Sequence, residues 1–470
     1  MTKKSAELMR NLGLFSIANF LPNVIAFFMI PLYTRYLSTA AYGKVDLVFN
    51  TVQLLIPVFT LQIQDAVMRY ALDEAYDKKD VFQVGFRITG TGFLMLALGC
   101  LVVGQSRLTG LEPSYLVLLL ACYLVGAWYN VLSFFCRGID EVKAITVASL
   151  LNMVVVLGGN ILFLVKFRLG FYGYFAAYLL GMMLSISFLV CKAKIWRFFE
   201  WRFQNKSVKK EMVRFSVPLI LNSLAWWINN ASDKYVLTFF CGVSAVGMYA
   251  AAYKIPTILK VFGDVIAMAF SISAIKEFDW RDEDGFIGKS YSMISLFMTV
   301  CCSVLMLCNV WIARILFAGE FFAAWKYVPP LLVSVLMNQL SFSCENIFVG
   351  ARKTKIISIT AVLGAVINTG FNFALIPVFG AYGAAVATAI GFTCFWAFRY
   401  YKLKQCIAIK NNPKKEYISY LLLIAQTVLA YFGNRFWYLQ LLVLAAILAL
   451  YTKEILSFVK GRFAENGKPF

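Results

Sequence analysis

The chain has 470 residues, of which 61% are hydrophobic and only 14% are charged, and its formal net charge is +20. This much apolar surface exceeds what one water-exposed fold could bury, so the composition excludes a soluble globule and indicates an integral membrane protein. Histidine is absent, which excludes histidine-dependent acid–base chemistry and most transition-metal sites, and no phosphate-binding loop or paired-carboxylate motif replaces it. These absences favour a transporter over an enzyme.

Apolar stretches of about 20 residues, the length that crosses roughly 30 Å of hydrocarbon as a helix, recur along the whole chain. They predict an all-α integral membrane protein with about 14 transmembrane helices, and twelve is the alternative number. The second and eighth stretches carry charges, and the thirteenth is short. The predicted spans cover residues 12–32, 45–65, 85–104, 114–134, 144–165, 172–191, 213–238, 246–270, 290–313, 328–348, 356–377, 382–398, 417–432 and 436–452.

Lysine and arginine are distributed unevenly among the predicted loops. If both termini are cytoplasmic, the basic residues in the loops on the opposite side are only Arg35, Arg107, Lys166, Arg168, Arg314, Lys326 and Arg435. This positive-inside pattern predicts a multi-pass protein with both termini in the cytoplasm. The basic cluster at residues 192–214 would attract anionic membrane lipids. The positive charge therefore follows the membrane topology and does not indicate nucleic acid as a partner.

Residues 137–181 match residues 349–391, which indicates an internal repeat. The matching pairs are Gly138 and Gly350, Lys143 and Lys355, Asn160 and Asn372, and, after a two-residue gap, Gly170 and Gly380, Gly173 and Gly383, and Gly181 and Gly391. Six spans per repeat place both halves in the same orientation, related by a pseudo-two-fold axis along the membrane normal. We predict a six-helix lobe at 1–200, a second at 201–405, and an extra C-terminal helix pair with a cytoplasmic tail at 406–470.

Four predicted helices carry polar residues along one face, at about 100° per residue. The second span has Asp46, Asn50, Gln53, Pro57, Thr60 and Gln64 on such a face, and the seventh has Asn222, Trp226, Asn229 and Asp233. Similar stripes occur in the first span at Ser16, Asn19 and Asn23, and in the tenth at Ser334, Asn338, Ser341 and Glu345. Such residues either line a wet passage or hydrogen-bond between packed helices, and both interpretations stay open.

Charges within spans need water or a partner, because each costs about 2.5–3.5 kcal/mol at the bilayer centre. The predicted substrate-binding set combines them with the polar stripes and Arg35: Arg35, Lys44, Asp46, Asn50, Gln53, Asp65, Arg69, Asn222, Trp226, Asn229, Asp233, Lys234, Lys254, Lys260 and Asp264. Helical spacing allows Asp264 to pair with either Lys260 or Lys254, and a purely structural ion pair is the alternative. We expect no cofactor and no metal site, while coupling to H⁺ or Na⁺ stays open.

Three stretches carry a resemblance to a known family. They are PLYTRYLSTAAYGKVD after the first span, QIQDAVMRYALDE after the second, and NNASDKYVLTFFCGVSAVGMYAAAYKI across the seventh and eighth. In order and spacing, over essentially the whole chain, they resemble the Wzx-type polysaccharide flippases of the multidrug/oligosaccharidyl-lipid/polysaccharide exporter superfamily. These flippases handle repeat units of polysaccharides such as O-antigen, the lipopolysaccharide side chain, and capsule.

The resemblance implies that an undecaprenyl-diphosphate-linked oligosaccharide is moved from the cytoplasmic to the outer leaflet of a bacterial inner membrane by alternating access. It also makes the polysaccharide polymerase machinery a candidate partner. Two other functions stay open. A drug/cation antiporter of the same superfamily would favour an acidic interior, whereas cations here at least match anions. A membrane glycosyltransferase or polymerase of the same pathway typically needs a large outer loop, and the predicted outer loops are short.

Overall fold

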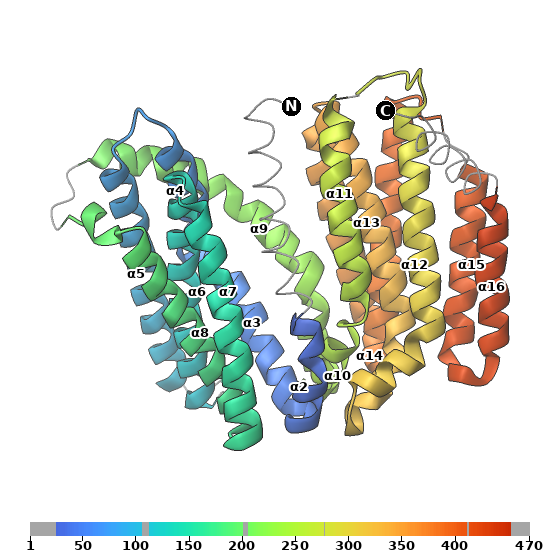
Figure 1. Ribbon diagram of the computed structural model, residues 1–470, viewed down its shortest axis with the longest axis horizontal. Helices are drawn as coiled ribbons and strands as arrows, with labels where there is room; N and C mark the ends of the chain where they lie inside the picture. Colours follow the sequence, from blue (N-terminus) through green and yellow to red (C-terminus); the bar gives the residue numbers. More distant parts are fainter. Residues whose placement is uncertain (1–24, 106–111, 201–204, 277, 411–412, 453–470) are drawn as a thin grey trace, which may run out of the picture. The chain divides into compact units, whose positions relative to one another are not determined.

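The computed structural model describes residues 25–105, 112–200, 205–276, 278–410 and 413–452 (Figure 1). Within these ranges the chain forms helices and no strand, which confirms the all-α prediction. The α-helices are α2 (Ile30–Tyr36), α3 (Thr39–Phe59), α4 (Ile63–Leu72), α5 (Lys78–Gln105), α6 (Pro113–Gly138), α7 (Val142–Asn160), α8 (Gly170–Lys192), α9 (Lys206–Cys241), α10 (Val243–Ala252), α11 (Pro256–Lys276), α12 (Phe286–Leu316), α13 (Val328–Gly350), α14 (Thr354–Cys406), α15 (Pro413–Tyr431) and α16 (Trp437–Leu450). Short 3₁₀ or π segments are η1 (Ile161–Lys166), η2 (Ile195–Phe198), η3 (Gly319–Tyr327) and η4 (Gly433–Phe436).

Every predicted span from the second onward overlaps a described helix, whereas most of the first span, 12–32, and its polar stripe lie outside the described residues. By length and composition, eight described helices could cross a membrane, or up to nine if α3 and α4 form one bent span. One reason for the lower number is that α14 combines two predicted spans, which meet at Gly380, where the backbone leaves the helical conformation. Another is that α10 is short.

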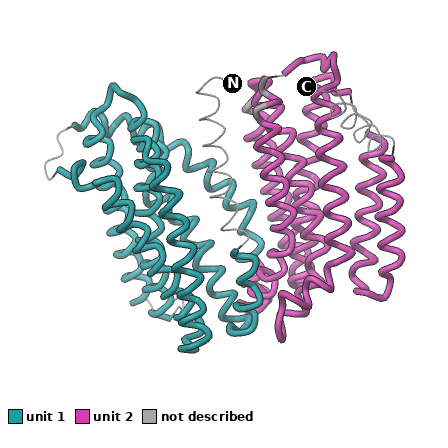
Figure 2. The backbone as a smooth tube through the Cα atoms, viewed as in Figure 1, with its two compact units in different colours: residues 1–235 teal, residues 236–470 magenta. Residues whose placement is uncertain are grey.

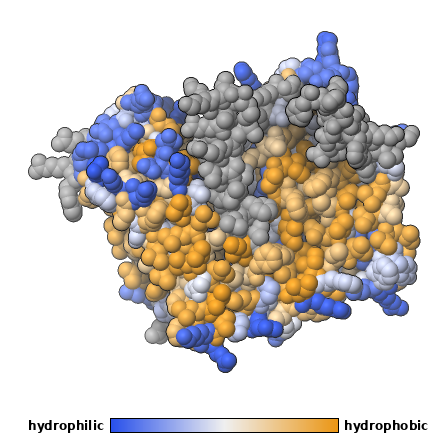
Figure 3. All heavy atoms as spheres, in the orientation of Figure 1, coloured by the Kyte–Doolittle hydropathy of each residue, from blue (hydrophilic) through white to orange (hydrophobic). Residues whose placement is uncertain are grey.

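The surface of the helices fits a lipid environment. On the face shown in Figure 3, hydrophobic residues cover the middle of the helices of each unit, and hydrophilic residues gather towards the helix ends. Large apolar side chains are exposed in both units, such as Leu98, which is 63% exposed, and Trp311, which is 68% exposed. Contiguous apolar surface on this scale is avoided in water. The chain is therefore a multi-pass membrane protein.

The chain divides into two compact units, residues 1–235 and 236–470 (Figure 2). The first part of α9 belongs to unit 1, where Met212 is fully buried in the core. Asn205, just before α9, donates a hydrogen bond of 2.9 Å to Asp80. The Tyr76 hydroxyl donates one of 2.8 Å to Glu211, which is the main reason why the pKa of Tyr76 is raised. These contacts hold the start of α9, just after the predicted boundary at 200/201, against unit 1. The three-part division itself stays a prediction.

Unit 1 has two core clusters, one towards each end of its helices. In one cluster, Ala71 at the end of α4, Phe135 at the end of α6 and Leu189 at the end of α8 pack with Val81 at the start of α5. These ends carry many of the unit's basic residues. The other cluster joins the opposite ends of α3, α5, α6 and α8. The basic loops of unit 1 thus lie at one end of the unit, as the positive-inside pattern requires. That this end is cytoplasmic stays a prediction.

The sequence repeat has a structural counterpart in each unit. Gly170 and Gly380 both have positive φ, 52° and 58°, a conformation that glycine adopts without a steric penalty. Gly173 and Gly383 both allow a close backbone approach, because a Cβ there would lie 3.2 Å from the Phe163 carbonyl oxygen and 2.3 Å from the Leu375 carbonyl oxygen, respectively. These matching glycines therefore have the same structural roles in the two units.

The second predicted span, 45–65, is not one straight helix. α3 ends at Phe59 and α4 begins at Ile63, and their axes differ by 58°. Between them, Leu61 and Gln62 adopt left-handed φ values of 53° and 52°, which are uncommon for residues other than glycine. The Gln62 amide donates to the Pro57 carbonyl oxygen across the break. Gly92 of α5 lies against this break, because a Cβ there would be only 2.0 Å from the Phe59 carbonyl oxygen.

We predict that Gly92→Ala destabilises the chain by about 1–3 kcal/mol, because overpacking against backbone forces a shift. The measurement is the thermal unfolding midpoint of the purified protein in detergent. Gly99→Ala on the same helix is the matched control, since a Cβ there meets nothing within 4 Å, and it should leave the midpoint unchanged or slightly higher. Equal midpoints for the two variants would show that α5 does not fix the break.

Candidate functional site

A cavity of about 450 Å³ lies within unit 1, at the break between α3 and α4. It is formed by α3, the start of α4, α6 and α9. The polar stripes predicted for the second and seventh spans meet here, because residues of both line the wall. The lining residues are Asn50, Gln53, Ile56, Pro57, Gln62, Gln64, Asn130, Asn222, Ser223, Trp226, Trp227, Asn230 and Ala231.

The chemistry of this wall is distinctive for a membrane-spanning unit. Seven of the thirteen lining residues are asparagine or glutamine, two are tryptophan, and none is charged. Irregular backbone at membrane depth is tolerated where it lines a cavity or is buried in protein. The break at Leu61 and Gln62 meets this condition, since Gln62 itself lines the cavity. The helix break and the polar cavity are therefore two parts of one feature.

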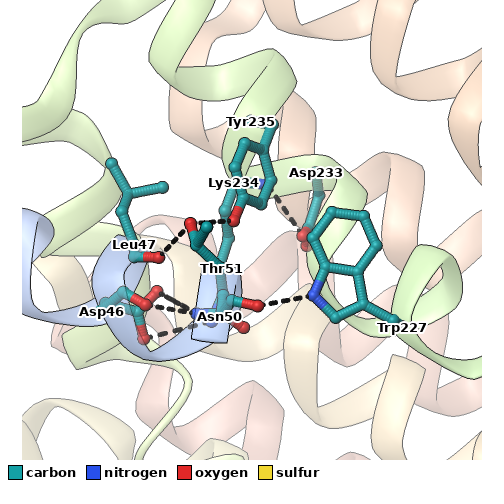
Figure 4. Close-up of polar contacts among 8 residues, drawn as sticks. All are labelled: Asp46, Leu47, Asn50, Thr51, Trp227, Asp233, Lys234 and Tyr235. Carbon is teal, nitrogen blue, oxygen red and sulfur yellow. Dashed lines mark hydrogen bonds and ion pairs between the residues drawn. The ribbon is translucent and has the colours of Figure 1, made fainter. Parts of the chain in front are cut away.

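An ion pair joins α3 to α9 beside the cavity (Figure 4). Lys234 Nζ lies 2.9 Å from Asp46 Oδ2, and the two side chains are only 14% and 21% exposed. The same Asp46 oxygen accepts a 2.9 Å hydrogen bond from Asn50 Nδ2. The charge of Lys234 is thus balanced by its partner, and the Asn50 carboxamide is oriented by the same carboxylate.

Two further bonds between α3 and α9 come from residues that the sequence interpretation missed (Figure 4). Trp227 Nε1 donates to the Asn50 carbonyl oxygen at 2.7 Å. The Thr51 and Tyr235 hydroxyls lie 2.7 Å apart. The spacing of Ser223, Trp227, Asn230 and Lys234 places them on one helical face next to the predicted stripe, so a wider polar stripe on α9 would have revealed Trp227.

Several predicted site residues of unit 1 lie outside the cavity wall. Asn229 and Asp233 are buried, 8% and 3% exposed, but do not line it. Asp65 accepts a 2.9 Å hydrogen bond from Gln62 Nε2 and so orients a lining residue. Arg69 stacks over the Phe215 ring, 4.7 Å from its centroid.

The cations at the start of α3 and the end of α2 are also separate from the cavity. Lys44 Nζ lies 3.7 Å from Glu112 Oε2, and both side chains are well exposed. Arg35 is exposed in the last turn of α2. The structure therefore brings Asp46, Asn50, Gln53, Asn222, Trp226 and Lys234 together, and leaves Arg35, Lys44 and Arg69 elsewhere in unit 1.

The remaining predicted residues belong to unit 2. Of the two predicted partners of Asp264, the structure selects Lys260, at 2.5 Å. Gln339 Nε2 donates to the second Asp264 oxygen at 2.9 Å and also to the Lys260 carbonyl oxygen. A cavity of about 300 Å³ adjoins Asp264, Gln339 and Asn346. Lys254, just before the start of α11, is half-buried and has no ion pair within the described residues.

A buried arginine in unit 2 was not predicted as a site residue. Arg399 is fully buried and lies 2.9 Å from Glu345 Oε2. Its Nε donates to Thr360 Oγ1 at 3.1 Å, and its guanidinium lies 4.3 Å from the centroid of the Phe395 ring. Desolvation makes a lone buried charge costly, so this network fastens α13 to α14. Arg399 sits next to the basic loop after the twelfth span, where sequence alone placed it with the loop cations.

Unit 2 also contains a larger, mainly apolar cavity of about 1050 Å³ between α11, α12 and the start of α15. Val265, Phe270 and Leu296 contribute to its apolar wall. Lys289, Lys410 and Lys415 line it as well, together with Glu416. Among the described residues, no group of three or more Cys, Asp or Glu side chains is placed to hold a metal ion.

We predict that Lys234→Ala destabilises the protein by about 2 kcal/mol, because it leaves the Asp46 carboxylate poorly solvated and without its cation. Asp46→Ala combined with Lys234→Ala should recover most of the lost stability, as measured by thermal unfolding in detergent. Lys44→Ala, which breaks an exposed pair, is the control and should cost less than about 1 kcal/mol. A double variant no more stable than Lys234→Ala alone would contradict the pairing.

Comparisons with known proteins give the family. The family described as polysaccharide biosynthesis protein matches residues 8–275. An uncharacterized membrane protein of Methanocaldococcus jannaschii is 27% identical over 221 residues. That match covers 44% of this chain and 44% of the relative, so the chain spans less than half the length of that relative.

Three solved structures share the fold. The lipid II flippase MurJ in an inward closed conformation has a TM-score of 0.69 and 13% identity, covering 95% of this chain and 99% of that chain. An inward-facing multidrug resistance MATE family transporter of the MOP superfamily has a TM-score of 0.62 and 14% identity, and the match covers 90% of this chain and 99% of that chain. A MOP superfamily transporter from Pyrococcus furiosus has a TM-score of 0.54 and 15% identity, and the match covers 84% of this chain and 95% of that chain. With the family match over more than half of its length, the chain belongs to the polysaccharide biosynthesis protein family, and it has the fold of the MOP superfamily transporters.

Proposed function

We propose that this chain is a flippase that moves an undecaprenyl-diphosphate-linked oligosaccharide from the cytoplasmic to the outer leaflet of a bacterial inner membrane. The observation that carries the proposal is the polar cavity of unit 1 at the broken α3–α4 helix, in a member of the polysaccharide biosynthesis protein family. A carrier of glycans across hydrocarbon needs polar groups at membrane depth, because the sugars lose their hydration water there.

The apolar cavity of unit 2 supports a lipid-linked substrate. Its apolar walls suit a polyprenyl chain. The lysines that line it suit a diphosphate, since clustered cations bind phosphate oxygens more strongly away from bulk water. Lys410 Nζ donates to the Glu283 carbonyl oxygen and Lys289 Nζ to the Asp284 carbonyl oxygen, and neither contact neutralises the lysine. We propose that polysaccharide polymerase machinery then takes up the exposed glycan.

The main alternative is export of cationic drugs, which the fold of the MATE transporters brings into consideration. A site for organic cations favours carboxylates that are free to face the ligand. Here the carboxylates nearest the unit 1 cavity have partners, Asp46 with Lys234 and Asp65 with Gln62, and no lining residue is charged. These features favour a neutral polar substrate over a cation.

Deletion of the gene in its source organism should block the outward passage of the glycan, so we predict that lipid-linked oligosaccharide accumulates and surface polysaccharide falls. The measurement is mass spectrometry of extracted membrane lipids together with staining of surface polysaccharide. The wild-type gene should restore both to parental levels. A deletion strain with unchanged lipid-linked oligosaccharide and increased sensitivity to cationic drugs would refute the flippase and support the exporter.

A further inference from the structure

We infer that the unit 1 cavity is the binding site for the sugar rings of the substrate, and that it recognises uncharged, polyhydroxylated rings and not the diphosphate. This inference rests on the proposed function and assigns one part of the substrate to one site. It is carried by the residue types on the wall, by their free hydrogen-bonding groups and by the geometry of the helix break.

The wall offers what a sugar ring needs on its edge and on its face. Each carboxamide has two N–H donors and a carbonyl acceptor, and sugar hydroxyls both donate and accept. Trp226 and Trp227 add two large aromatic surfaces to the same wall. The flat C–H face of a sugar ring packs well on such a surface, whose rim remains polar. A volume of about 450 Å³ falls within the usual range of small-molecule sites, about 300–1,000 Å³.

Several carboxamides of the wall are available to a ligand. Within the described part of the chain, the side chains of Gln53, Asn130 and Asn222 make no hydrogen bond. The side-chain N–H groups of Asn50 and Gln62 each donate a hydrogen bond to a carboxylate, that of Asp46 and that of Asp65 respectively. These two donations fix the carboxamide planes and leave both carbonyl oxygens as acceptors. The wall therefore combines oriented acceptors with uncommitted donors.

The helix break adds Gln62 to this wall. At 100° per residue, Gln53 and Gln64 would share a face of a straight helix, whereas Gln62 would lie on the opposite face. The 58° bend and the left-handed conformations of Leu61 and Gln62 bring all three glutamines to one cavity. Backbone strain of this kind persists where the surrounding structure imposes it, and it is concentrated at ligand sites.

The electrostatics of the wall select against the diphosphate. An anion of this charge would be held by lysine, arginine or a cluster of backbone amides, and the lining contains no charged side chain. Lys234, the nearest cation on α9, is committed to Asp46. The lysines at the unit 2 cavity are the better candidates for the diphosphate.

The test compares two ligands on the purified full-length chain: the lipid-linked oligosaccharide extracted from the deletion strain, and bare undecaprenyl diphosphate. The wild-type chain should bind the glycan-bearing lipid at least about tenfold more tightly, since several polar contacts and a stacked ring are added. Trp226→Ala and Asn222→Ala should each remove about tenfold of this advantage and leave the affinity for bare undecaprenyl diphosphate unchanged. Trp226→Phe should keep most of it.

Trp311→Ala is the matched control, because Trp311 is an exposed tryptophan on α12 of unit 2 and its loss should change neither affinity. Gel filtration and melting curves show whether each variant is folded, and Asn222→Ala alone carries the test if Trp226→Ala does not fold. Equal wild-type affinity for the two lipids would overturn the inference, as would variants that weaken both lipids by the same factor.

The proposed function and this inference fail in different ways. If the deletion strain accumulates no lipid-linked oligosaccharide, both are wrong. If it does accumulate the compound, but the cavity variants retain the full glycan advantage, only the assignment of the sugar site is wrong.

Discussion

Inside hydrocarbon, a polar group that has left water must find its partner within the protein, because bulk solvent is not there to replace it. This constraint explains the main features of both units. Asp46 and Lys234 pair between α3 and α9, and Arg399 is enclosed by Glu345, Thr360 and an aromatic ring. The backbone interrupted after Phe59 lies at a polar cavity, which Pro57 and Gln62 help to line. What is not paired, namely several carboxamides of the cavity wall, is where a polar ligand can enter.

In unit 1, some contacts fix the helices around the cavity, whereas several side chains on the cavity wall remain available to a ligand. The ion pair, the Trp227 bond and the Thr51–Tyr235 bond fasten α3 to α9 on one side of the cavity. Gly92 allows α5 to support the break from another side. This rigid frame holds side chains such as Gln53 and Asn222 at the wall without binding them, which limits the entropy that a ligand would have to remove.

Sequence periodicity located much of this architecture. The length of the apolar stretches predicted the all-α membrane fold, matching glycines and polar residues predicted the repeat, and helical periodicity predicted the stripes that contribute Asn50, Gln53, Asn222 and Trp226 to one cavity. The break at Leu61 and Gln62 was not predictable, because neither residue is a glycine and Pro57 signals a bend without its position or angle. Asn130 was missed because it lies alone on the apolar α6, and Arg399 because its side chain turns inward from the edge of a basic loop. The sequence placed Lys44, Lys234 and Lys260 in the substrate-binding set, whereas in the structure each of these lysines forms an ion pair with a carboxylate.

Reconstitution of the purified protein tests whether this chain alone carries a lipid-linked glycan across a bilayer, as we propose. Purified protein would be incorporated into sealed vesicles that contain the fluorescently labelled lipid-linked oligosaccharide in both leaflets, and an enzyme that cleaves the glycan would be added outside. If the chain is a flippase, vesicles with protein lose the label of both leaflets, whereas protein-free vesicles retain the label of the inner leaflet. Retention of the inner-leaflet label in vesicles with folded protein, with and without an imposed H⁺ or Na⁺ gradient, would show that the chain does not move this lipid.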